Sequence, residues 1–101
     1  MLRHIVMFRF AEGQPEADKV VAVQALEALA GQVPEIRSLT VATGVPGNPA
    51  ACDLVLVADF EGEAEFRRYG EHEAHVHAWK SVVQPLVSDV ATIQYHREGE
   101  P

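Results

Sequence analysis

The sequence predicts an α+β domain in which helices cover one face of an antiparallel sheet. Its 101 residues are enough for one domain with a hydrophobic core. Hydrophobic residues make up 48% of the chain and charged residues 23%, which is typical of a globular protein. Segments with strand and helix periodicity follow in the order strand, helix, strand, strand, helix pair and strand. That order indicates the α+β class.

Charge and cysteine content exclude several classes of function. Fifteen acidic residues against eight basic ones give a net charge of −7, which repels nucleic acid and anionic lipid. The single cysteine excludes an internal disulfide and a thiolate metal cage. No apolar run approaches the roughly 20 residues needed to span a bilayer, and the N-terminal segment lacks a signal-peptide cleavage site. We therefore expect a cytoplasmic protein without nucleic-acid or membrane partners.

Residues 2 to 10 form the first predicted strand, because isoleucine, valine and phenylalanine dominate the segment. Its even-numbered positions are almost wholly apolar and should face the core. His4 lies on that face. A histidine in this position is either satisfied by a neighbouring carbonyl group or functional.

A helix is predicted over residues 15 to 32. Pro15 suits a first helical turn, and Gly31 with Pro34 ends the helix. The small residues of its apolar stripe should let the helix lie close to a sheet or leave space beside it. The stripe consists of Ala22, Ala25, Leu26, Leu29 and Val33.

Two strands follow, at residues 37 to 43 and 53 to 60, with a turn-rich loop at residues 44 to 49 between them. The first of the two is less apolar and should be partly exposed. The second has a continuous apolar run at residues 54 to 58, so both of its faces should be buried. Helices can cover only one face in so small a domain, and we expect a second copy of the chain to cover the other.

The C-terminal part contains a helix pair and a closing strand. The predicted helices cover residues 61 to 69 and 71 to 84, with Gly70 as the interruption. Helical spacing places His72, His75 and Trp79 on the inward face and His77 on the outward face. The closing strand is predicted over residues 90 to 96.

This order of elements matches the split βαβ arrangement of ferredoxin-like domains, an antiparallel sheet with helices on one face. We assign residues 1–97 to a single domain and residues 98–101 to a solvated tail.

Tyr69, His72 and His75 lie within seven residues of one another. A buried histidine tends to stay neutral and can then accept a proton, while a tyrosine hydroxyl can stabilise an oxygen that gains negative charge. Such a site needs no cofactor. The same histidines could instead bind loop carbonyls and fix the helix on the sheet. A metal site is disfavoured, because Glu73 should point away from both histidines and their spacing is not that of HExxH.

Four segments resemble the stress-responsive A/B barrel (Dabb) family: HIVMFRF, VPEIRSL, CDLVLVADFE and especially YGEHEAH. The resemblance implies a ferredoxin-like fold whose sheets pair across a homodimer into an α/β barrel. One branch of the family is similar to olivetolic acid cyclase, a plant polyketide cyclase that catalyses an intramolecular aldol condensation without a cofactor.

Carried over by motif position, the resemblance implies His75 as general base and Tyr69 as hydrogen-bond donor to the oxyanion. It implies His4 and His72 as supporting polar groups. The family's usual residues differ at Glu73 and Gln94, but neither change removes a proposed catalytic atom. The remaining predicted substrate-binding residues are apolar: Leu26, Leu56 and Trp79.

The sequence leaves three functions open. The first is a protein that binds a small apolar or polyketide-like molecule, with cofactor-free acid–base chemistry of the aldol-cyclase type. The second is a non-catalytic homodimer with a structural or protein-interaction role. The third is a cofactor-free monooxygenase, because dimeric ferredoxin-like barrels also support that chemistry. All three predict no cofactor, no metal and a second copy of the chain as partner.

Overall fold

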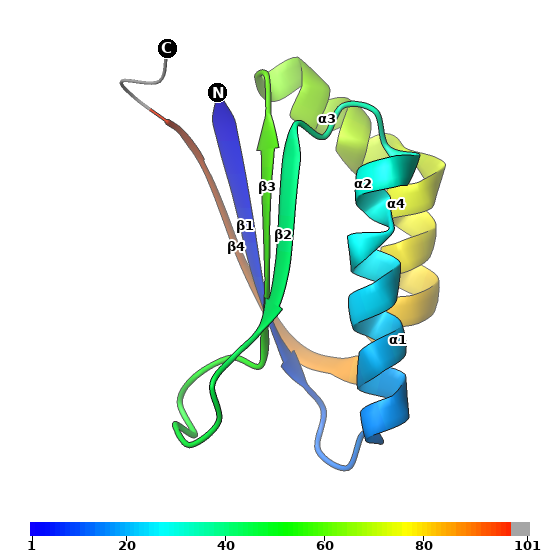
Figure 1. Ribbon diagram of the computed structural model, residues 1–101, viewed down its shortest axis with the longest axis vertical. Coiled ribbons are helices and arrows are strands. Elements are labelled where there is room, and N and C mark those ends of the chain that lie inside the picture. The colour runs from blue at the N-terminus through cyan, green and yellow to red at the C-terminus, as the bar shows by residue number, and fades with distance from the viewer. Residues whose placement is uncertain (98–101) are drawn as a thin grey trace.

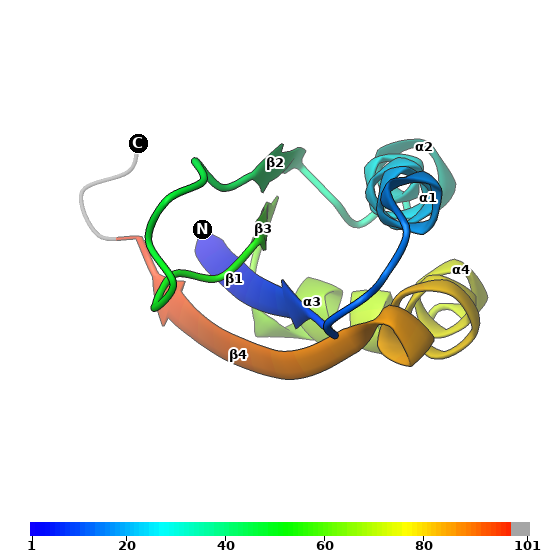
Figure 2. The same ribbon diagram turned by 90° about the horizontal axis from the view of Figure 1, so that it is seen from below.

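A computed structural model describes residues 1–97, and the predicted tail at 98–101 lies outside them. Four antiparallel strands form one sheet: β1 (Leu2–Phe10), β2 (Ser38–Thr43), β3 (Leu54–Phe60) and β4 (Val87–His96). Their order in the sheet is β2-β3-β1-β4. All helices lie on one side of this sheet, as Figures 1 and 2 show. The predicted ferredoxin-like α+β fold is confirmed.

The first predicted helix consists of α1 (Glu16–Glu27) and the short α2 (Leu29–Gln32), with Ala28 between them in helical conformation. Its predicted stripe packs on the sheet, although Ala25 is only half-buried. In this stripe Ala22, Leu26, Leu29 and Val33 are buried. The small side chain at Ala22 lets α1 approach the sheet closely.

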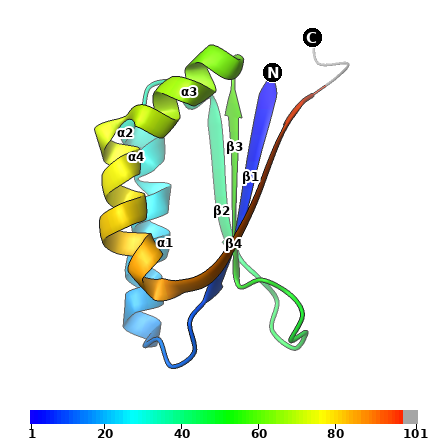
Figure 3. The same cartoon turned by 180° about the vertical axis from the view of Figure 1, so that it is seen from behind.

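The helix pair differs in detail from its prediction. Helix α3 (Glu63–Glu71) includes Gly70, and the interruption lies at His72, whose extended backbone separates α3 from α4 (Glu73–His77). A π-helical turn, η1 (Ala78–Val83), and a 3₁₀ turn, η2 (Gln84–Leu86), follow without a gap. Strand β4 then begins three residues before the predicted start. Figure 3 shows this second helical segment running alongside α1 and α2 on the same side of the sheet.

Alternate side chains of strand β1 point to the two faces of the sheet. Its even-numbered residues are buried against the helices, as predicted, and the odd-numbered ones are less buried. On the second face, Ile5 lies opposite Val57 and Ile93, while Met7 lies opposite Val55. Ile93 is 57% exposed and Met7 41% exposed in the single chain. The face away from the helices is therefore apolar and uncovered.

One carboxylate joins all four strands at an end of this open face. Asp59 of β3 is 4% exposed and accepts two hydrogen bonds from Arg3 of β1, at 2.9 and 3.0 Å. Ser38 of β2 and Arg97, directly after β4, also donate to it. The Arg3 guanidinium is the main cause of the lowered pKa of Asp59. The charge is thus stabilised although the carboxylate is buried.

We expect Asp59→Ala to lower the free energy of unfolding by about 2–3 kcal/mol at neutral pH, because its donors lose a shared acceptor. Urea denaturation measures the change. Asp89→Ala is the matched control, since the Asp89 carboxylate is 72% exposed and 3.8 Å from Arg9. That variant should lose less than about 0.5 kcal/mol. Equal losses in the two variants would contradict the structural role of Asp59.

Candidate active site

A partly open cavity of about 180 Å³ lies between the helix side of the sheet and the helices. Strands β1, β3 and β4 form one wall, and residues from α1 to η1 form the other. Six of the seven predicted site residues line this cavity. They are His4, Leu26, Leu56, Tyr69, His75 and Trp79.

Three polar rings meet in the cavity. The ring centroids of Tyr69 and His75 are 4.4 Å apart, and those of Tyr69 and His4 are 5.8 Å apart. These residues come from α3, α4 and β1, so only the folded chain brings them together. Tyr69 and His75 lie close together because the helix is interrupted at His72, which turns α4 relative to α3.

A backbone carbonyl fixes the proton on His75. The Nδ1 atom of His75 lies 3.1 Å from the carbonyl oxygen of Gly70. Because a carbonyl can only accept, Nδ1 carries the proton and Nε2 of the neutral ring keeps its lone pair. Burial lowers the pKa of His75, and the bond to Gly70 opposes that shift only in part. His75 is therefore a neutral base at physiological pH.

Tyr69 supplies a proton donor beside this base. Its side chain is 2% exposed and packs against Phe60 and Phe66. Burial raises the pKa of Tyr69 to about 12, so the phenol stays protonated. Its hydroxyl makes no hydrogen bond to the described residues. The hydroxyl is thus available to an oxygen atom of a bound molecule.

His4 is also neutral, again mainly because it is buried. It is 7% exposed, and burial lowers its pKa to about 4, with a smaller contribution from the nearby His75. A second positive charge beside His75 is unfavourable in this apolar space. When His75 accepts a proton, His4 therefore remains uncharged.

His72 does not line the cavity. Its Nδ1 accepts a hydrogen bond of 3.0 Å from the backbone N–H of Ala74 and caps the first turn of α4. The prediction that His72 faces inward with His75 assumed one continuous helix from residue 71. The break at His72 changes the helical phase, and Val76 is also exposed instead of inward. The expected outward position of His77 is confirmed.

Strand β4 contributes residues that the sequence analysis did not select. Val90 and Thr92 line the cavity, and Gln94 hydrogen-bonds His4. Alternation along the closing strand could have indicated them, because all three share one face of the sheet. They were missed because β4 lacks the strong apolar pattern of β1 and β3.

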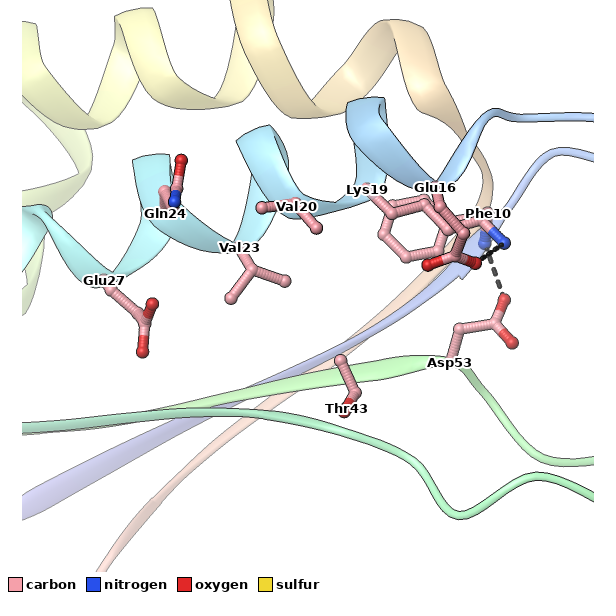
Figure 4. Close-up of a pocket in the computed structure, with 9 residues that line it drawn as sticks. All are labelled: Phe10, Glu16, Lys19, Val20, Val23, Gln24, Glu27, Thr43 and Asp53. Carbon is pink, nitrogen blue, oxygen red and sulfur yellow. Dashed lines mark hydrogen bonds and ion pairs between the residues drawn. The ribbon is translucent and has the colours of Figure 1, made fainter.

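A larger cavity of about 480 Å³ lies beside α1, next to the ends of β1, β2 and β3 (Figure 4). Three of its polar side chains already have partners within the chain. Asp53 accepts a 2.8 Å hydrogen bond from the backbone N–H of Phe10, and Lys19 pairs with Glu16 at 3.3 Å. No histidine or tyrosine lines it. The histidine cavity is therefore the better site for acid–base chemistry, although it is smaller.

The described residues hold no cluster of three or more histidine, cysteine, aspartate or glutamate side chains suited to a metal ion. Within residues 1–97, no helix has the length and apolar character needed to cross a membrane.

Comparison with known proteins identifies the family. The model of the stress-responsive A/B barrel domain, Dabb, matches residues 2–96. The chain belongs to the Dabb family. An uncharacterised protein of Streptomyces coelicolor is 29% identical over 94 residues, which cover 88% of this chain and 97% of that protein.

Solved structures show the same fold. A dimeric ferredoxin-like protein of unknown function from Thermobifida fusca has a TM-score of 0.84 and 26% identity, with 93% of this chain and 88% of that chain covered. Hydroxynitrile lyase from Passiflora edulis also has a TM-score of 0.84, at 16% identity, with 99% and 96% covered. The first neighbour is a dimer, and the second is a hydroxynitrile lyase.

We expect His4 to make stability depend on pH. Its folded pKa of about 4 lies below the ordinary value of 6.5, so between these values only the unfolded chain binds the proton. The contribution of neutral His4 to the free energy of unfolding is fully present above pH 6.5. It is lost as the pH drops, by about 3 kcal/mol between pH 7 and pH 4. Urea denaturation of wild type and His4→Phe measures the difference. His77→Phe, at an exposed site, is the control. Parallel pH profiles for wild type and His4→Phe would contradict this account.

Proposed function

We propose that this protein binds a small, mainly apolar carbonyl compound in the histidine cavity and catalyses proton transfer at carbon without a cofactor. The observation that supports the proposal most is the neutral His75 ring, 4.4 Å from the Tyr69 ring in an apolar cavity. A base and a hydroxyl donor side by side are the two parts that enolate formation requires.

The reaction begins when Nε2 of His75 takes a proton from the carbon next to a carbonyl group. The C–H electron pair forms the new C=C bond, and the carbonyl oxygen becomes an enolate that accepts a hydrogen bond from Tyr69. In an aldol cyclisation, the enolate carbon attacks a second carbonyl of the same molecule. The protonated His75 then returns its proton to the new alkoxide, which restores the neutral base.

The cavity volume limits the substrate. A cavity of about 150 Å³ in another protein holds one benzene molecule, and the histidine cavity measures about 180 Å³. The reacting part of the substrate is therefore about one ring in size. A longer polyketide-like chain fits only if its remainder extends through the open side. Leu26, Leu56 and Trp79 provide the apolar contacts for the bound part.

The active form in this proposal is a homodimer. The apolar face around Ile5, Val57 and Ile93 is the surface that a second copy would cover. The dimeric ferredoxin-like protein of Thermobifida fusca supports that assembly.

A direct test of the chemistry uses deuterium exchange. Phenylacetone in D₂O should exchange its protons next to the carbonyl group faster with the protein than in buffer, as followed by ¹H NMR. We expect His75→Ala to slow the catalysed exchange about 10²–10⁴-fold and Tyr69→Phe about 10²–10³-fold. The exposed His77→Ala should keep the wild-type rate. Circular dichroism confirms that each variant is folded.

Two results would contradict the proposal. One is exchange that His75→Ala and His77→Ala affect equally. The other is a cavity that neither binds nor converts any one-ring carbonyl compound, which would favour the non-catalytic homodimer. A separate assay, which measures the release of cyanide from an aromatic hydroxynitrile, tests the lyase chemistry named for the Passiflora neighbour.

The dimer has its own test. Met7→Glu places a charge at the centre of the apolar sheet face, and we expect it to produce monomers because an unpaired charge is costly to bury. Val21→Glu is the control, since Val21 is exposed on α1, on the helix side. Sedimentation velocity measures the mass in solution. A monomeric wild-type protein, or a Met7→Glu variant that still forms dimers, would contradict the proposed assembly.

A further inference from the structure

Gln94 lies on the edge strand β4 and contacts His4, which lines the cavity. It lies on β4 directly opposite His4 of β1. Its Nε2 atom is 2.8 Å from Nδ1 of His4 and 2.8 Å from the hydroxyl oxygen of Thr92. Each hydrogen of this amide nitrogen therefore has an acceptor.

This contact decides which nitrogen of His4 carries the proton. An amide nitrogen is only a donor, so Nδ1 of His4 accepts and holds a lone pair. The neutral ring then has its proton on Nε2. Because Nδ1 is turned toward β4, Nε2 is the ring nitrogen left for the cavity that His4 lines.

We propose that Gln94 is a positioning residue that holds His4 as an Nε2–H donor toward the cavity, beside the hydroxyl of Tyr69. The catalytic meaning of this donor rests on the proposed function, because it gives the enolate oxygen a second hydrogen bond. The three polar residues of the site then have two separate roles. His75 accepts the proton, whereas His4 and Tyr69 donate hydrogen bonds to the oxygen.

The surroundings of His4 agree with this division. The rings of Phe66 and Tyr69 pack against it at centroid distances of 4.9 and 5.8 Å. His75 is the titratable group that opposes its protonation, and no carboxylate hydrogen-bonds its ring among the described residues. A glutamate in place of Gln94 would reverse the polarity of the contact, because a carboxylate accepts from Nδ1–H and stabilises the imidazolium.

The test is ¹⁵N NMR of histidine-labelled protein, with the His4 signals assigned by their loss in His4→Phe. In the wild type we expect the Nε2–H tautomer at neutral pH. In Gln94→Glu we expect Nδ1 to carry a proton and the pKa of His4 to rise by about one to three units. Gln84→Glu makes the same charge change at an exposed position and should leave His4 unchanged. Gln94→Leu, which only removes the donor, should give a mixture of both tautomers.

An Nδ1–H tautomer in the wild type would overturn the proposal. An unchanged tautomer in both Gln94→Leu and Gln94→Glu would also overturn it, and if one variant does not fold, the other decides. The NMR result does not depend on turnover, so it separates this proposal from the proposed function. If both hold, Gln94→Glu slows phenylacetone exchange about tenfold or more, while Gln84→Glu keeps the wild-type rate.

Discussion

The structure depends on strand β1, which is paired on both sides and cannot shift its register by one residue without turning every side chain to the other face. Its even positions put His4 among the core side chains, and its odd positions put Ile5 and Met7 on the open face. The cavity and the proposed dimer surface are thus opposite sides of one strand. The hydrogen bonds that converge on Asp59 join all four strands at one end of this arrangement.

The chemistry of the site comes from three polar groups that burial keeps neutral. His75 is neutral through burial, with its proton held by the Gly70 carbonyl. Tyr69 keeps its proton because burial disfavours the phenolate. His4 is neutral through burial and the proximity of His75. A base and donors with separated pKa values in one apolar space are the arrangement that acid–base catalysis requires.

Much of this arrangement could be predicted from the sequence. The alternation of β1 indicated the inward position of His4, and the apolar run in β3 indicated that the second face of the sheet is also apolar, although that face is open in the single chain. The place of His72 could not be predicted, because helical spacing assumes a continuous helix and the side chain of His72 instead caps a new one. The contact between Gln94 and His4 could not be predicted either, because it follows from the β1–β4 register and not from a local sequence pattern.

The central claim is that His75 is a neutral base whose Nε2 faces the cavity. Its titration in ¹⁵N-histidine-labelled protein tests this claim most directly. The account predicts an Nδ1–H tautomer at neutral pH and protonation only below the ordinary histidine pKa of 6.5. A His75 ring that carries both protons at pH 7, or whose proton resides on Nε2, would contradict the account.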